Sequence, residues 1–265
     1  MEREVGAARE DEIAAALLDR SPRTGPTPGA IDGPYWFDVD LVRADLREDR
    51  RGLETRLVLR VLETRGGETG PFRGVWGVAP PQETVPVHGA MVEVWHCDAA
   101  GVYSGFEEIS RMEIPIPMGD DGLPAGPMPG GDAGPSDGSY SRGEPESTRT
   151  DDATYLRGAQ PTDASGIARF TTIYPGWYVS RTSHVHVKVH RERRNVLTAQ
   201  LYLDDGLSDE IHTTVAPYTD HVARDTRNET DFLFTPECRL EAERHGDRVI
   251  AAIDLVLGPE AVPGC

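Results

Sequence analysis

Cysteine and basic residues are scarce in this sequence, and both shortages restrict what the chain can be. The three cysteines, Cys97, Cys238 and Cys265, are widely spaced and form neither a disulfide framework nor a CxxC zinc motif. Lysine and arginine number 27 against 45 aspartate and glutamate residues, so the formal net charge is −18. A surface this acidic repels nucleic-acid phosphates and anionic lipid headgroups, so neither is an expected partner.

Long hydrophobic runs and a leader segment are missing as well. No apolar stretch approaches the ~20 residues that a membrane-spanning helix needs, so no membrane association is expected. The first ten residues, MEREVGAARE, are charged and lack the apolar segment of a secretory signal. The sequence therefore favours a cytoplasmic protein, although a chain already trimmed of a leader would look the same.

Glycine and proline are not abundant enough to indicate a disordered chain. They number 28 and 21 among 265 residues, below the share of roughly a quarter or more that marks low-complexity sequences. With 38% hydrophobic residues the chain can build a core, and its length fits one large domain. We expect an N-terminal helix and Pro/Gly-rich linker in residues 1–30 and a single domain over 31–265.

Several short segments of strand character are separated by turn residues rather than by long helices. This pattern predicts an all-β fold, a β-sandwich of mixed antiparallel strands with long loops and a short N-terminal helix around 10–20. The last segment is also compatible with a buried helix. The expected strands cover 53–63, 90–95, 167–174, 184–190, 197–203 and 249–257.

One stretch departs from this pattern. From about 107 to 154 the chain is rich in glycine, proline, aspartate and serine, and it cannot bury enough apolar surface for a core of its own. We interpret it as a long excursion from the sandwich. Its middle is best explained as a disordered loop, with a lid or an oligomer contact as the functional alternative.

The most informative segment alternates strictly between valine and polar residues. In His184-Val185-His186-Val187-Lys188-Val189-His190 the valines share one strand face and should point to a core. The same pleat directs His184 and His186 to one side, an arrangement that suits two imidazoles on one metal ion. A His-x-His pair alone is a weak signal, because a polar strand face also holds histidines by accident, and His190 has this explanation.

Two tyrosines lie close to these histidines in the chain. Tyr103 follows the strand that ends at Trp95, and Tyr178 comes six residues before His184. Taken singly, each is better explained by a core or rim tyrosine whose hydroxyl is hydrogen-bonded.

Together these segments resemble the intradiol ring-cleavage dioxygenases, the relatives of protocatechuate 3,4-dioxygenase and catechol 1,2-dioxygenase. The resemblance is densest over 87–106 and 156–205, and it extends more thinly from Asp32 to the C-terminus. The segments that carry it, in chain order, are VHGAMVEVWHCDAAGVYSGF, LRGAQPTDASGIARFTTIYPGWYVSRTSHVHVKV and LTAQLYLDD.

The resemblance implies one non-haem Fe(III) ion per chain, held by the phenolates of Tyr103 and Tyr178 and the imidazoles of His184 and His186. It also implies that the tyrosine matching Tyr178 leaves the metal when substrate binds. The residues matching Arg181 and Gln200 would lie beside the substrate ring and stabilise charge that develops on it.

The chemistry of these side chains agrees with that implication. A phenol with a pKa near 10 ionises at neutral pH only when a strong Lewis acid replaces its proton. Ferric iron prefers anionic oxygen donors, whereas zinc favours thiolate or a third imidazole. The activity that the resemblance implies is O2-dependent cleavage of a catechol between its two hydroxyl-bearing carbons, with both oxygen atoms entering a muconate-type dicarboxylate.

Weaker candidates surround this set. The segment Asp32-Gly33-Pro34-Tyr35-Trp36 resembles the family's N-terminal Gly-Pro-Tyr element, so Pro34, Tyr35 and Trp36 are candidates for lining the substrate cavity. A turn that delivers aromatic side chains to the core explains them equally well. His96 and Cys97 are expected to be buried, the first as a hydrogen-bonding group and the second as a small core residue.

Two other functions remain as alternatives. A β-sandwich binding module without turnover, or a zinc hydrolase using the same two histidines, would keep much of this pattern. The expected small-molecule partners are a catechol and O2. About 30 residues precede Asp32, too few for the multi-helix segment of the catechol 1,2-dioxygenase branch, so a compact chain is expected and a homo-oligomer is left open.

Overall fold

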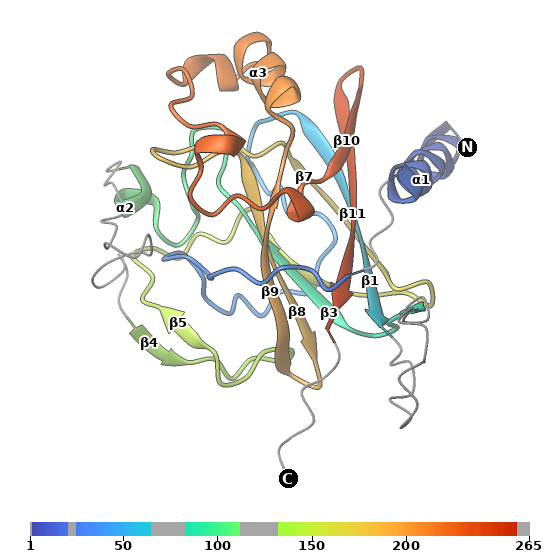
Figure 1. Ribbon diagram of the computed structural model, residues 1–265. Coiled ribbons are helices and arrows are strands. Elements are labelled where there is room, and N and C mark those ends of the chain that lie inside the picture. Colours follow the sequence, from blue (N-terminus) through green and yellow to red (C-terminus); the bar gives the residue numbers. More distant parts are fainter. Residues whose placement is uncertain (1, 21–24, 65–82, 112–131, 259–265) are drawn as a thin grey trace, which may run out of the picture.

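The computed structural model describes residues 2–20, 25–64, 83–111 and 132–258, and within them two β-sheets pack face to face (Figure 1). In the first sheet β1 (Glu54–Thr64) is central, pairing in parallel with β11 and antiparallel with β2 and β7, while β10 borders β11. The second sheet is antiparallel, in the order β6-β3-β8-β9. Strands of the first sheet besides β1 are β2 (Thr84–Pro86), β7 (Ile167–Ile173), β10 (Glu241–His245) and β11 (Arg248–Leu257), and those of the second are β3 (Met91–Trp95), β6 (Arg157–Pro161), β8 (His184–Arg191) and β9 (Arg194–Tyr202).

One apolar core fills the space between the two sheets. Leu57, Leu59 and Val61 of β1 belong to the same buried cluster as Val187 and Val189 of β8. Burial of apolar surface between two sheets is the main driving force for this architecture. The expected all-β sandwich is therefore confirmed, and the ambiguous segment 249–257 is a strand, not a helix.

The N-terminal helix α1 (Glu2–Arg20) lies on the outer face of the first sheet, at the right in Figure 1. Its Leu17 and Leu18 pack against Val58 of β1 and Ile250 of β11, so the alternate residues of these strands are covered by the helix. None of the described helices combines the length and the apolar composition needed to cross a bilayer.

The predicted excursion over 107–154 contains regular structure at both ends. It begins with α2 (Glu107–Arg111) and includes a small sheet of β4 (Asp132–Pro135) and β5 (Pro145–Ser147). Its middle, for which a disordered loop or a lid is expected, lies outside the described residues. The backbone N–H of Ser147 donates to the carbonyl of Trp36 at 2.9 Å, which ties β5 to the segment covering the second sheet.

The remaining helices lie in the C-terminal third of the chain. Helix α3 (Asp205–Thr214) starts at the N-cap Asp204, whose side chain accepts from the N–H of Leu207, and it lies at the top of Figure 1. Three short 3₁₀ turns follow: η1 (Tyr218–Asp220), η2 (Asn228–Thr230) and η3 (Pro236–Cys238).

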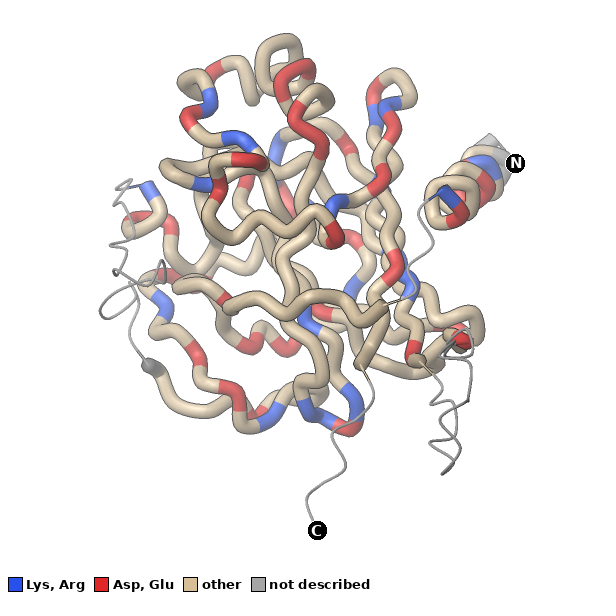
Figure 2. The backbone as a smooth tube through the Cα atoms, in the orientation of Figure 1, with Lys and Arg blue, Asp and Glu red and all other residues tan. Residues whose placement is uncertain are grey.

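Charged residues of both signs are spread over the loops and outer surfaces (Figure 2). The turn between β8 and β9 is rich in arginine. There Arg191 pairs with Glu63 at 2.9 Å and Arg193 with Asp137 at 2.8 Å. These are partly exposed ion pairs, which contribute little to the free energy of folding.

Candidate active site

Strand β8 presents two imidazoles on the outer face of the second sheet. Its valines enter the core, and the alternation of the pleat therefore directs His184 and His186 away from it. Across the β8–β9 ladder His186 pairs with Gln200. Two of the predicted site residues are thus neighbours because of strand register.

The two tyrosines come from loops that interlock through glycines. A Cβ atom at Gly101, where φ is +82°, would lie 2.3 Å from the carbonyl oxygen of Trp177, and one at Gly176 would lie 2.4 Å from that of Asp98. Only glycine permits backbones to approach this closely. The loop before Tyr103 and the loop before Tyr178 are consequently packed directly against each other.

Four donor atoms converge where these loops meet β8. The Nε2 atom of His184 lies 3.4 Å from Tyr103 Oη, 3.5 Å from Tyr178 Oη and 3.2 Å from His186 Nε2. The Nδ1 of His184 lies 2.6 Å from the carbonyl oxygen of Thr182. Because a carbonyl only accepts, Nδ1 carries the proton and the Nε2 lone pair faces the other three donors.

The spacing and chemistry of this donor set fit a single metal ion. Donors bound to one first-row ion at about 2 Å lie roughly 3 Å apart, close to the distances found here. Within the described residues no group of three or more His, Cys, Asp and Glu side chains is arranged to hold a metal. A metal ion at His184 and His186 would therefore take the phenol oxygens as its further ligands.

Burial controls the protonation of all four side chains in the protein alone. It raises the pKa of Tyr103 well above the usual value of a phenol and also raises that of Tyr178. The pKa values of His184 and His186 are well below the ordinary range, chiefly through burial and then through Arg181 for His184 and through His184 for His186. Neutral imidazole is the form that binds a metal, and a bound cation would lower the pKa of the phenols.

The tyrosines differ in accessibility. Tyr103 has no exposed surface, whereas Tyr178 is partly exposed. Tyr178 Oη also accepts a hydrogen bond from an Nη of Arg181 at 3.3 Å. Of the two tyrosines, the one expected to leave the metal is thus the one with partial exposure.

Arg181 and Gln200 lie together beside this cluster. The second Nη of Arg181 donates to Gln200 Oε1, and Gln200 Nε2 donates to the carbonyl of Ile31 at 3.0 Å. Burial alone would lower the pKa of Arg181, but Tyr178 and then Asp231 outweigh it, so the pKa is raised. The guanidinium therefore remains charged next to the donor set.

The three cavity candidates at 34–36 divide between two environments. The Tyr35 ring stacks on Tyr103 with centroids 4.7 Å apart and meets Tyr178 edge-on at 6.5 Å. Trp36 is buried and points elsewhere: its Nε1 donates to Glu93 at 3.3 Å. Pro34 is buried. Among the three, Tyr35 is the residue in contact with the candidate ligands.

The rest of the polar face of β8 belongs to a buried ionic cluster. Lys188 Nζ lies 3.1 Å from Asp32, 2.9 Å from Glu144 and 3.7 Å from the centre of the Trp36 ring. His190 Nε2 lies 3.0 Å from Glu93. This cluster fastens the segment carrying Tyr35 to the sheet, so His190 has a structural partner there rather than a place among the converging donors.

His96 and Cys97 are both buried, as expected. His96 Nδ1 donates to the carbonyl of Cys97 at 2.8 Å, which leaves Nε2 to accept from the hydroxyl of Thr172 at 2.7 Å. Burial lowers the pKa of His96 to about 4 and raises that of the Cys97 thiol.

Three further residues shape the site and were not anticipated. Trp95 stacks on the His186 ring, with centroids 4.8 Å apart and planes within 10°. The carbonyl oxygen of Thr182 accepts a hydrogen bond from His184 Nδ1, and Asp231 forms a buried ion pair with Arg181 at 2.9 Å. The position of Trp95 at the end of a strand next to β8 was a usable signal, whereas no local pattern marks Asp231.

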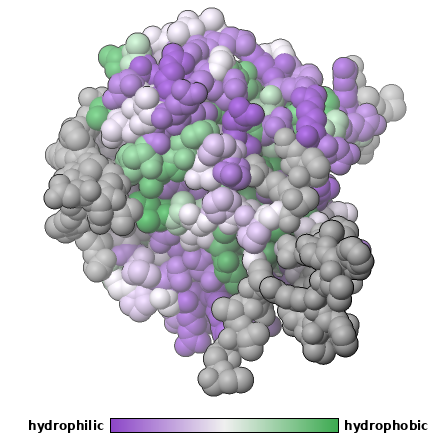
Figure 3. Space-filling view, viewed as in Figure 1, coloured by the Kyte–Doolittle hydropathy of each residue, from purple (hydrophilic) through white to green (hydrophobic). Residues whose placement is uncertain are grey.

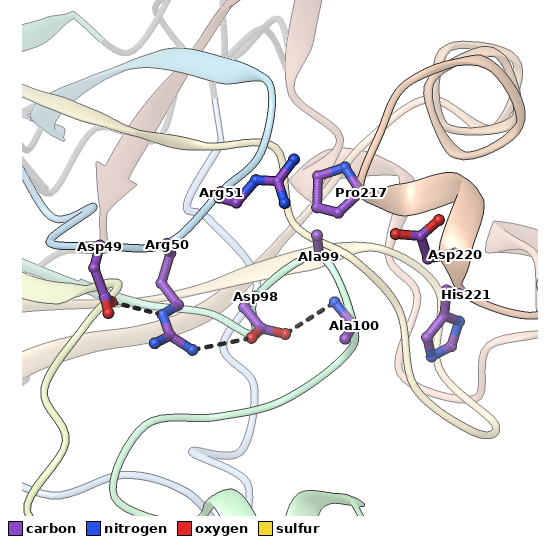
Figure 4. Close-up of a pocket in the computed structure, with 9 residues that line it drawn as sticks. All are labelled: Asp49, Arg50, Arg51, Asp98, Ala99, Ala100, Pro217, Asp220 and His221. Atoms are coloured by element: carbon purple, nitrogen blue, oxygen red, sulfur yellow. Dashed lines mark hydrogen bonds and ion pairs between the residues drawn. The ribbon is translucent and has the colours of Figure 1, made fainter.

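A separate hollow of about 380 Å³ opens beside the loop that carries Tyr103 (Figure 4). Its Asp98 accepts from the N–H of Ala100 at 2.9 Å and lies 3.7 Å from Arg50, which also pairs with Asp49. It is lined by Asp49, Arg50, Arg51, Asp98, Ala99, Ala100, Pro217, Asp220 and His221, and it includes none of the predicted site residues.

No protein-family model and no curated protein sequence matches this chain. Among solved structures, an intradiol ring-cleavage dioxygenase from Tetranychus urticae is similar at a TM-score of 0.64 and 24% identity, covering 89% of this chain and 96% of that one. A second dioxygenase structure gives 0.65 and 23%, covering 90% and 96%. A catechol 1,2 dioxygenase from Acinetobacter radioresistens gives 0.52 and 18%, covering 96% and 68%. This chain therefore has the fold of the intradiol ring-cleavage dioxygenases, as the sequence resemblance led us to expect.

Proposed function

We propose that this protein is a non-haem Fe(III)-dependent intradiol dioxygenase that opens the ring of a catechol between its two hydroxyl-bearing carbons. The observation that carries the proposal is the convergence of Tyr103 Oη, Tyr178 Oη and His186 Nε2 within 3.2–3.5 Å of His184 Nε2. These atoms belong to the four residues that the sequence resemblance implies as iron ligands, and the fold is shared with solved dioxygenase structures, which supports the proposal.

The donor set favours ferric iron over zinc. Two tyrosinates supply two negative charges and hard oxygen donors, while the structural and catalytic zinc sites of proteins rely on thiolate, imidazole and carboxylate. Ferric iron, when bound, supplies a Lewis acid that withdraws electron density from a chelated catechol. A zinc hydrolase at this site would have to bind its zinc ion through the same two phenols, which are not among the usual zinc ligands.

The protein's own groups account for proton transfer and charge. Tyr178, the partly exposed tyrosine, would yield its place to the substrate, and its phenolate oxygen would accept a catechol proton. The Nη of Arg181 that now donates to Tyr178 Oη would then face the substrate oxygen and stabilise negative charge on the ring. Gln200 holds the other Nη in place. Tyr103, fully buried against Tyr35, stays fixed throughout.

The surroundings of the site suit an aromatic substrate. The Phe232 ring lies 5.5 Å from the Arg181 guanidinium and is 38% exposed, and Ile31, whose carbonyl holds Gln200, is 40% exposed. Figure 3 shows hydrophobic areas within a mostly hydrophilic surface. Exposed apolar side chains next to buried polar groups are typical of small-molecule sites.

Iron content and catalysis together test the proposal. The purified protein should bind about one iron ion per chain at this four-donor site, have the red-brown colour of a tyrosinate–iron complex, and consume O2 with catechols. A panel of catechol, protocatechuate, hydroxyquinol and larger substituted catechols would define the substrate. A colourless protein that binds stoichiometric zinc and remains inactive after iron loading would show that the proposal is wrong, and iron binding without turnover would indicate a binding module.

A further inference from the structure

Asp231, directly after η2, is a buried carboxylate in contact with two parts of the candidate site. Its side chain has no exposed surface and accepts from Arg181 Nε at 2.9 and 3.1 Å. It also accepts from the backbone N–H of Thr182 at 2.8 Å and of Leu233 at 2.9 Å. All of its partners are thus donors, and the ionised form is fully hydrogen-bonded.

We propose that Asp231 is a positioning residue that orients Arg181 toward the reacting ring and fixes the turn leading to His184. This role rests on the proposed dioxygenase function. It assigns no contact between Asp231 and the substrate, because the carboxylate lies behind the guanidinium on the Nε edge.

The planar shape of the guanidinium makes this anchor effective. The three nitrogens of Arg181 have separate partners: Nε has Asp231, one Nη has Tyr178 and the other has Gln200. Because the group is rigid, fixing the Nε edge sets the direction of both Nη atoms. Without Asp231, the buried cation would lose its counter-charge and turn from the site toward any remaining acceptor.

The second group of contacts of Asp231 is with the backbone before β8. Its carboxylate accepts a hydrogen bond from the N–H of Thr182 and so fixes this residue. The carbonyl oxygen of Thr182 in turn accepts a hydrogen bond from Nδ1 of His184. Such groups behind a ligand set its tautomer and ring orientation. The amide oxygen of an asparagine can still accept a hydrogen bond from the Thr182 N–H, but it provides no counter-charge for Arg181. Substitution by asparagine therefore separates the contact with Thr182 from the ion pair with Arg181.

Asp231→Asn is the principal variant, and Asp254→Asn is its matched control. Asp254 is also buried and binds Arg60 through two hydrogen bonds of 2.7 and 2.9 Å, but it lies in the first sheet on β11. We expect Asp231→Asn to retain iron and anaerobic catechol binding while kcat falls about 10–100-fold, the usual cost of disturbing a group behind the ligands. Asp254→Asn should lower thermal stability with kcat changed less than about twofold, because it removes only a distant ion pair.

A double-mutant cycle decides whether Asp231 acts through Arg181. In an Arg181→Ala background, adding Asp231→Asn should change kcat by less than about twofold, since the group it orients is gone. A full 10–100-fold loss in that background would overturn the proposal. In metal-free protein, the Nε–H resonance of Arg181 should exchange slowly with solvent, and Asp231→Asn should make it exchange fast; unchanged protection would also contradict the role.

If Asp231→Asn does not fold, Asp231→Glu tests the same point, because it keeps the charge and displaces the guanidinium by one methylene. We expect it to fold, bind iron and lose at least tenfold in kcat, and full activity would refute the proposal. Wild-type protein that binds iron but cleaves no catechol would instead refute the dioxygenase function. An active wild type with fully active Asp231→Asn and Asp231→Glu would refute the positioning role alone.

Discussion

His186 and His190 share one face of strand β8, yet only His186 directs its Nε2 at another candidate ligand, His184, at 3.2 Å; His190 instead lies 3.0 Å from Glu93. The same strand thus offers a test of which histidines hold the metal. His186→Ala should lose iron together with the charge-transfer colour. His190→Ala should keep the iron and lower stability by about 1–3 kcal/mol, because Glu93 loses a buried partner.

Metal analysis and the visible spectrum of the two purified variants measure this difference. Equal iron content in both would contradict the assignment of His186. Loss of iron from His190→Ala, in a variant that still folds, would show that the ionic cluster around Lys188 belongs to the metal site.

The interlocked tyrosine loops predict a large effect of a small substitution. At Gly101 a Cβ atom would meet the Trp177 carbonyl oxygen in a backbone that already has φ of +82°. Gly101→Ala should therefore cost about 2–4 kcal/mol of unfolding free energy and reduce metal retention.

Gly89→Ala is the control, because Gly89 has φ of +75° and open space around it. It should cost only about 1–2 kcal/mol. Denaturant unfolding of both variants checks the comparison, and equal losses would mean that the close approach is unimportant.

Arg181 is expected to contribute to both stability and catalysis, since it is buried and paired with Asp231. Arg181→Ala should destabilise the fold by about 3–5 kcal/mol, because it leaves a buried carboxylate unpaired. Arg181→Lys keeps the charge and should recover much of the stability but little of kcat, because a single ammonium cannot reproduce three directed contacts. Thermal unfolding and single-turnover kinetics on the two variants separate these effects, and full activity of Arg181→Lys would contradict the role of the planar group.

The buried His96 gives a pH dependence of stability. Its pKa is about 4 in the folded protein, chiefly through burial, against about 6.5 in the unfolded chain. The folded state binds its proton less readily, so the stability from a neutral His96 is present above pH 6.5 and is lost as the pH falls toward 4. The loss amounts to about 3 kcal/mol.

His96→Gln should remove this titration, so the difference in unfolding free energy between wild type and variant should shrink by that amount between pH 7 and 4. A constant difference would contradict the burial argument.

Much of this fold follows from local patterns. Strict alternation predicted both faces of β8, and turn residues delimited β1, β3, β7 and β9 correctly to within a few residues. The sequence did not predict the short strands, because three to five residues are too few to show an alternation of apolar and polar side chains. These strands are β2, β4, β5, β6 and β10. Strand β11 was ambiguous, since a strand buried on both faces has no alternation to distinguish it from a buried helix.

Only part of the candidate site could be predicted from the sequence. Tyr103, Tyr178, His184 and His186 could be grouped through their resemblance to known motifs, and the structure brings them together. Asp231 could not, because its partner Arg181 is 50 residues away and the pair forms only through tertiary packing. The ionic partners of Lys188, Asp32 and Glu144, were hidden for the same reason.

The most direct test of the central claim is the mass of the product formed from catechol under ¹⁸O2 by the iron-loaded protein. Intradiol cleavage by the site of Tyr103, Tyr178, His184 and His186 predicts a ring-opened muconate in which both atoms of one O2 molecule are incorporated. A yellow semialdehyde, the product of cleavage beside the hydroxyl-bearing carbons, or a muconate without label would contradict the account.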